Sequence, residues 1–137
     1  MQKLIVLIAF LSLLMFSCHE EVAMESSTEI NWMTSFEEDT TYLDSLNQEI
    51  IVRAGSFDCV NAAEWTFTAM GSRACGGPEM YIAYSTKLDT VAFLNLVKLY
   101  TDSQSLFNTK WGIGSICAIV TPPKGVECVN GLPVFIY

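Results

Sequence analysis

The residues with the widest chemical repertoire in this chain are its five cysteines, Cys18, Cys59, Cys75, Cys117 and Cys128. A cysteine can act as a nucleophile, bind zinc or form a disulfide. A catalytic cysteine needs a base, and the only histidine, His19, directly follows Cys18 near the amino terminus. Zinc sites use closely spaced cysteine pairs, and the four later cysteines include no such pair. The sequence therefore predicts no Cys–His enzyme, no metal site and no cofactor.

An apolar run at residues 4–16 follows Lys3 and ends in Ser17 and Cys18. A basic residue followed by an apolar run of this length is typical of a secretory signal peptide. The run is shorter than the roughly 20 apolar residues that span a membrane. Small residues for an ordinary cleavage site are poorly placed after it, whereas a cysteine stands at its end. We therefore predict that residues 1–17 are a signal peptide.

The segment LMFSC, residues 14–18, resembles the lipobox of bacterial lipoproteins. The resemblance implies that Cys18 becomes the mature amino terminus, carries acyl chains and anchors the protein to the outer membrane. Each buried CH₂ contributes about 0.8 kcal/mol to membrane binding, so two or three chains hold a protein firmly. Glu20 and Glu21 look like the acidic signals that send some lipoproteins to the cell surface. They are equally an ordinary start to a linker, so the periplasmic leaflet stays open as a location.

Lipidation of Cys18 would leave an even set of four cysteines, which suits two disulfides in an oxidising compartment. Four cysteines allow three pairings. We favour Cys59 with Cys75 and Cys117 with Cys128, because Pro122-Pro123 would form a turn between two strands and place the latter two opposite each other. The other two pairings stay open.

Acidic residues are concentrated before the predicted domain. Residues 19–52 contain nine Asp or Glu and no Lys or Arg, whereas residues 53–137 contain six acidic and six basic residues. Nucleic acids and anionic lipid headgroups both require a positive surface. We therefore expect no nucleic-acid binding, and predict that residues 18–40 are an acidic, flexible tether.

Residues 41–137 are predicted to form one small disulfide-stabilised α+β domain. Residues 41–54 have the helical spacing of Leu43, Leu46, Ile50 and Ala54, and residues 64–69 alternate like a half-buried strand. Residues 88–111 are predicted to form a long central helix, with Asp89 as its N-cap and Gly112 at its end. Antiparallel strands are expected at residues 116–121 and 126–137, and a break of the second strand at Asn130-Gly131 is left open.

A glycine-rich stretch, residues 71–85, is the strongest local candidate for a ligand loop. Backbone N–H groups near Gly76 and Gly77 could bind an anion together with Arg73, and Tyr81 and Tyr84 could stack on a sugar or peptide. The simpler interpretation, which we favour, is a turn beside a disulfide with both tyrosines packed on the long helix. The ACGGP…YxAYS arrangement resembles uncharacterised small envelope lipoproteins, and this resemblance implies no activity.

Together these features predict a lipid-anchored lipoprotein of the cell envelope that binds a protein or glycan partner. Inhibition of a hostile enzyme is one form that such binding could take. A structural envelope component without a discrete ligand is the alternative, and an enzyme ranks third, because the sequence shows no catalytic constellation.

Overall fold

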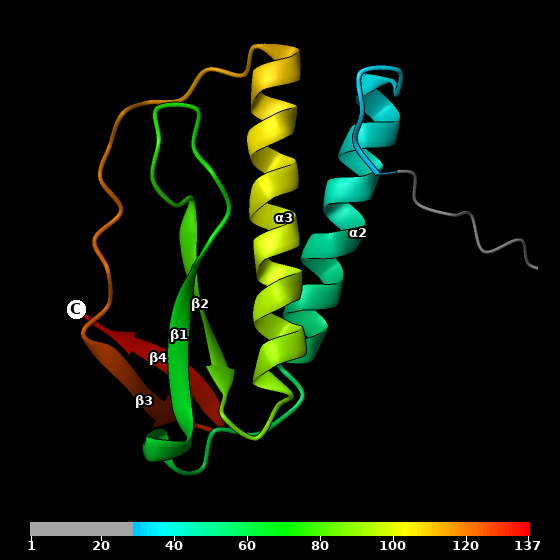
Figure 1. Ribbon diagram of the computed structural model, residues 1–137. Helices are drawn as coiled ribbons and strands as arrows, with labels where there is room; N and C mark the ends of the chain where they lie inside the picture. The colour runs from blue at the N-terminus through cyan, green and yellow to red at the C-terminus, as the bar shows by residue number, and fades with distance from the viewer. Residues whose placement is uncertain (1–28) are drawn as a thin grey trace, which may run out of the picture.

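The computed structural model describes residues 29–137, which form an α+β domain of two α-helices, one short 3₁₀ helix and two antiparallel β-hairpins. In chain order the elements are α2 (Phe36–Ala54), η2 (Ala62–Glu64), β1 (Trp65–Met70), β2 (Met80–Ser85), α3 (Thr90–Trp111), β3 (Gly125–Val129) and β4 (Leu132–Ile136). Figure 1 shows the two helices side by side and antiparallel, with β1 and β2 beside α3 and the second hairpin at the foot of the first. The predicted fold class is confirmed.

Helix α2 begins earlier in the chain than the sequence indicated. Ser35 is its N-cap: the Glu38 N–H donates to Ser35 Oγ at 3.2 Å, and the Ser35 N–H donates to Glu38 Oε2 at 2.7 Å. This reciprocal capping box satisfies two helix-end donors. Ile30, before the cap, is 4% exposed and belongs to the core. Residues 29–40 are therefore folded onto the domain rather than part of a tether, while residues 1–28, including the predicted signal and Cys18, lie outside the described residues.

Helix α3 has the termini that the sequence predicted. The Asp89 side chain accepts a hydrogen bond from the Ala92 N–H at 3.0 Å, and Gly112 ends the helix in the left-handed conformation at φ +62°. A left-handed residue at this position is a common helix terminator, because it lets the chain turn away and satisfies a final carbonyl. Gly112 therefore sets the direction in which the chain leaves the helix.

The helices and the first hairpin share one hydrophobic core. Its centre is formed by Ile50 on α2 and Phe93 on α3, both with no exposed surface, and the ring of Tyr84 on β2 lies 4.8 Å from that of Phe93. Burying a side chain of this size contributes roughly 1.5–3 kcal/mol. The buried members of the cluster are Ile30, Tyr42, Leu43, Leu46, Ile50, Ala54, Met70, Tyr84, Phe93, Val97 and Tyr100.

The second hairpin uses Asn130-Gly131 as its turn. Both residues have positive φ, +52° and +81°, which suits a tight hairpin turn between strands of right-handed twist. The open alternative of a break at this dipeptide is therefore confirmed, and it divides the predicted strand into β3 and β4. Residues 116–121 form no strand. Strand β2, in contrast, was missed, because the turn signals of Gly76, Gly77 and Pro78 directly precede it.

The four domain cysteines form two disulfides, but the favoured pairing was wrong. Cys59 pairs with Cys128, with Cα atoms 5.2 Å apart, and Cys75 pairs with Cys117 at 5.5 Å. The prediction failed because it placed the turn at Pro122-Pro123. Cys128 instead lies in β3, whose partner is β4, and the Cys59 N–H donates to the Gly131 carbonyl beside that hairpin at 2.8 Å. Each disulfide thus links segments that are far apart in the sequence.

Candidate functional site

Two distant segments meet at one end of the first hairpin. The β1–β2 loop, residues 71–79, lies against the chain that connects α3 to β3, and the Cys75–Cys117 disulfide joins them. The Cys75 N–H also donates to Ser115 Oγ at 3.2 Å. In Figure 1 this orange connection leaves the top of α3, passes the green loop and descends beside the hairpin. We call residues 112–120 the connecting segment.

The connecting segment is open to solvent along nearly its whole length. Residues 112–119 are all exposed, and the side chains of Ile116 and Ile119 are 80% and 94% exposed. No charged residue occurs from residue 111 to residue 123. Large exposed apolar side chains that lie close together are a feature of interaction surfaces.

The connecting segment is nevertheless held by the fold at its start, its middle and beyond its end. At the start, the Ile113 N–H donates to the Asn108 carbonyl of α3 at 3.0 Å. In the middle, the disulfide to Cys75 holds Cys117. The residues on either side of Cys117 are also linked, because the Ala118 N–H donates to the Ile116 carbonyl at 2.9 Å. After the end, Pro123 is buried. The exposed isoleucines therefore stand on a braced backbone.

Arg73, a predicted ligand-loop residue, is used within the fold. Its Nη1 donates to the Ala118 carbonyl of the connecting segment at 2.7 Å. Its own N–H donates to the Gly77 carbonyl at 3.0 Å, and its carbonyl accepts from the Gly76 N–H at 2.9 Å. The two glycines have φ values of +92° and +80°, which this turn requires and which side chains disfavour. Arg73 thus closes the loop and braces the segment.

A hollow of about 210 Å³ lies between the loop and the connecting segment. It is lined by Arg73, Cys75, Gly76, Gly77, Pro78, Cys117, Ala118, Ile119 and Val120. Pockets for small organic ligands usually have volumes of roughly 300–1,000 Å³. The hollow is therefore better matched to a single side chain of a larger partner than to a whole small molecule.

Tyr81 and Tyr84 do not share a face. Both lie on β2, and residues three apart on a strand point to opposite sides of the sheet. Tyr84 is buried against Phe93 of α3, as the simpler interpretation predicted for it. The prediction that Tyr81 also packs on the long helix was wrong, because Tyr81 faces the other side, where its ring lies 5.9 Å from that of Phe67 on β1. The two rings therefore form no common stacking platform.

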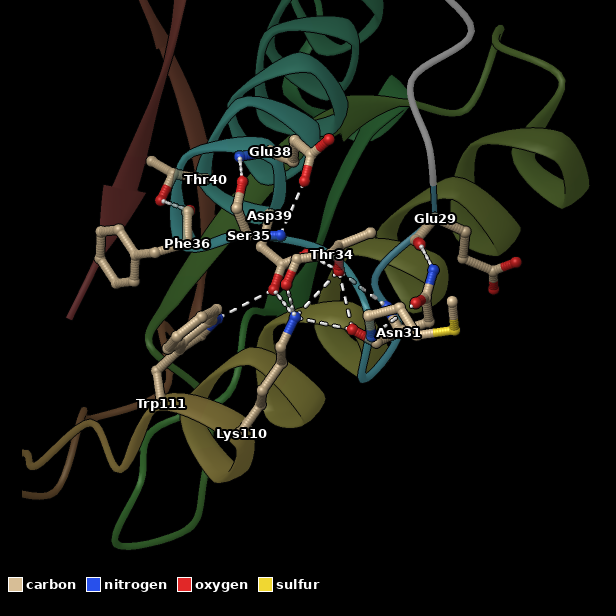
Figure 2. A network of polar contacts seen from close by, with 11 residues as sticks. Glu29, Asn31, Thr34, Ser35, Phe36, Glu38, Asp39, Thr40, Lys110 and Trp111 are labelled. Carbon is tan, nitrogen blue, oxygen red and sulfur yellow. Dashed lines mark hydrogen bonds and ion pairs between the residues drawn. The ribbon is translucent and has the colours of Figure 1, made fainter.

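A buried polar network that the sequence did not reveal joins the start of α2 to the end of α3 (Figure 2). Lys110 Nζ lies 2.6 Å from Asp39 Oδ2, and the two side chains are 6% and 0% exposed. The ammonium also donates to the Asn31 and Thr34 carbonyls at 2.6 and 2.5 Å. Trp111 Nε1 donates to the same carboxylate oxygen at 2.8 Å. The network clamps the turn before α2 to the helix from which the connecting segment departs.

The surroundings of Asp39 determine its ionisation. Burial by itself would raise the pKa of this carboxyl group, but hydrogen bonds from Lys110, Thr34 and Trp111 outweigh burial and lower the pKa below its ordinary value. Asp39 is therefore ionised at neutral pH. Because a buried charge is tolerated only when paired, this cluster is a structural clamp that depends on both partners.

Comparisons with known proteins add no family to this picture: no protein-family model matches the chain, and no curated protein or solved structure resembles it significantly. Among residues 29–137, no helix is long and apolar enough to cross a membrane. The same residues contain no cluster of three or more histidine, cysteine, aspartate or glutamate side chains placed to hold a metal ion.

Proposed function

We propose that this protein is a lipid-anchored binding module of a bacterial cell envelope. In this proposal acylated Cys18 attaches the chain to the outer membrane, and the α+β domain carries the binding surface. The two disulfides of the domain support an oxidising location, because such bonds persist in exported proteins and are rare in the cytosol.

The observation that carries the proposal is the braced connecting segment. An exposed segment that is already held in one conformation loses little conformational entropy when a partner binds it. Ile116 and Ile119 supply apolar surface that is left in water without a partner. Because the segment has no charged residue and few polar side chains, it suits a protein partner better than a glycan.

Affinity capture with a matched surface variant tests the binding proposal. The oxidised full chain and its Ile119→Asp variant would be exposed to envelope extract and secreted proteins. Ile119 is 94% exposed, so the substitution should leave folding unchanged. We expect a partner that the variant holds at least about 10-fold more weakly, since burying an isoleucine contributes roughly 1.5–3 kcal/mol. Equal capture by both chains would contradict a binding role for this segment.

The anchor has a separate test. The mass of the amino-terminal peptide from membrane-purified protein should show acyl chains on Cys18. A Cys18→Ala chain should lose them and leave the membrane fraction. A Cys18→Ala chain that is unacylated by mass yet still wholly membrane-bound would overturn the lipoprotein proposal.

A further inference from the structure

We propose that the connecting segment is a protease-inhibiting loop, with Ile119 as the side chain that enters the specificity pocket of an extracellular serine protease. This inference rests on the proposed function, because it names the class of protein that the binding module engages. The backbone geometry, the side-chain chemistry and the attachment of the segment each support it.

The backbone around Ile119 is free to pair with a partner. Within the described part of the chain, no group hydrogen-bonds to the backbone of Ile119 or Val120. Proteins that bind an extended peptide do so largely through its main-chain N–H and C=O groups. The neighbouring Ala118 carbonyl is turned toward the domain, where it accepts from Arg73 at 2.7 Å.

Ile116 is a weaker candidate for the same role, although its side chain is 80% exposed. Its carbonyl already accepts a hydrogen bond from the Ala118 N–H, which closes a tight turn at Cys117. The next side chain, Cys117, is drawn toward the domain by its disulfide. The bond between Ile116 and Cys117 therefore lies within a hydrogen-bonded turn, whereas in the described part of the chain no backbone hydrogen bond constrains the bond between Ile119 and Val120.

The chemistry of the segment indicates which proteases it suits. A specificity pocket with a buried aspartate selects a basic side chain, whereas a small apolar pocket of the elastase type accepts a branched aliphatic one. Ile119 is aliphatic, and its neighbours Ala118, Val120 and Thr121 are small or β-branched and uncharged. The segment thus matches the elastase type of pocket.

The attachment of the segment at both ends explains why it would inhibit the protease rather than be cleaved and released as a substrate. Hydrolysis between Ile119 and Val120 would add one water and leave a carboxylate on the first residue and an amine on the second. The first end would stay tied through the Cys75–Cys117 disulfide and Arg73, and the second through buried Pro123 and β3, which the Cys59–Cys128 disulfide holds. Because neither end can diffuse away, re-formation of the bond with loss of that water competes with release.

A switch of specificity tests this inference sharply. The purified full chain would be assayed against pancreatic elastase and trypsin with small chromogenic substrates. We expect inhibition of elastase by the natural chain. The Ile119→Arg chain should inhibit elastase at least about 100-fold less well and should gain inhibition of trypsin, because the aspartate in the trypsin pocket binds arginine. The matched control is Val91→Arg, which adds the same charge at a 71% exposed position on α3, outside the connecting segment, and should leave elastase inhibition within about threefold.

A second variant tests the bracing. Elastase should cleave the Cys75→Ala, Cys117→Ala chain between Ile119 and Val120 and then dissociate from it. Intact mass after incubation should show the gain of one water, because the Cys59–Cys128 disulfide keeps the two parts of the cleaved chain together. If the folded natural chain does not inhibit elastase and its Ile119→Arg variant does not inhibit trypsin, the inference is overturned. The proposed binding function would still stand after that result if a captured partner bound the natural chain more tightly than the Ile119→Asp chain. If no captured partner showed this difference, the proposed function would be overturned as well.

Discussion

At the scale of single residues, the pair of Asp39 and Lys110 is the most sensitive point of the fold. The two charges are almost completely removed from water, and each depends on the other for compensation. Lys110 also fixes two backbone carbonyls of the turn before α2. The exposed pair of Lys98 and Asp102, also on α3, provides a contrast, since its side chains are 72% and 62% exposed.

Removing each lysine should therefore have very different effects. We expect Lys110→Met to lower the free energy of unfolding by about 3–5 kcal/mol, because it leaves a buried carboxylate without its partner. The control, Lys98→Met, should cost less than about 1 kcal/mol, since exposed ion pairs contribute little. Urea denaturation of both variants measures the two values. Similar losses in both would show that the Asp39 cluster does not clamp the helices.

The lowered pKa of Asp39 also predicts a pH dependence. Because the folded state binds this proton less tightly than the unfolded state, the stabilisation is fully present above the unfolded pKa of about 3.9 and is lost as pH falls through the lower, folded pKa. Unfolding free energies measured from pH 6 down to pH 2 should therefore decrease in acid. The Asp39→Asn chain should show a shallower decrease in unfolding free energy. Some decrease should remain, because the hydrogen bond from the Ser35 N–H also lowers the pKa of Glu38. An unchanged slope would contradict the assignment.

At the scale of elements, the sequence predicted those features that depend on residues close together in the chain, such as helix ends and helix faces. Helix α3 could be placed because Asp89 and Gly112 mark its ends, and the inward face of α2 could be read from the spacing of Leu43, Leu46 and Ile50. The start of α2 was missed because its capping box lies within an acidic, serine-containing stretch that resembles a linker. The disulfide partners were missed because pairing depends on which strands meet, which is a property of the tertiary fold.

The candidate site was only partly visible in the sequence. The glycine-rich loop was identified, and its residues Arg73, Gly76 and Gly77 do line the hollow beside the connecting segment, which Arg73 braces. Tyr81 and Tyr84 lie away from that hollow. The charge-free stretch from residue 111 to 123 was the signal for that segment, and we interpreted part of it as a strand. A short continuous run of apolar residues fits a strand and an exposed loop equally well, because only packing partners distinguish the two.

The β1–β2 loop yields a prediction from two glycines with similar backbone angles. Gly71 has φ +78°, and an added Cβ would lie 2.6 Å from Gln104 Oε1, which accepts from the Ser72 N–H. Gly77 has φ +80° with open space around it. We expect Gly77→Ala to cost about 1 kcal/mol for the backbone conformation alone, and Gly71→Ala about 2–3 kcal/mol, because it also displaces a hydrogen-bonded side chain. Thermal unfolding of both variants tests this order, and the reverse order would contradict it.

At the scale of the whole molecule, the two disulfides hold long connections onto a small domain. The Cys75–Cys117 bond closes a separation of 42 residues and the Cys59–Cys128 bond one of 69. The entropic model gives about 4 kcal/mol for each closure, a large share of the roughly 5–15 kcal/mol by which domains are stable. The bonds therefore contribute to stability as well as to the display of the connecting segment.

Breaking the two bonds separately should distinguish these roles. Replacing Cys75 and Cys117 by alanine should cost up to about 4 kcal/mol and weaken partner binding, since the segment loses its central attachment. Replacing Cys59 and Cys128 should cost at least as much, because Cys59 is also buried, but should leave the affinity of the remaining folded protein nearly unchanged. Chemical denaturation and binding to the captured partner provide the two measurements. Equal loss of affinity in both variants would contradict a separate role for the first bond.

The most direct test of the central claim, that the connecting segment is the binding surface, is site-specific photo-crosslinking in intact cells. A photoreactive amino acid would replace Ile119, and in a matched chain Val91, which is 71% exposed in the first turn of α3. The account predicts a crosslinked adduct of defined mass from position 119 and none from position 91. Adducts from position 91 alone, or equal adducts from both, would contradict it.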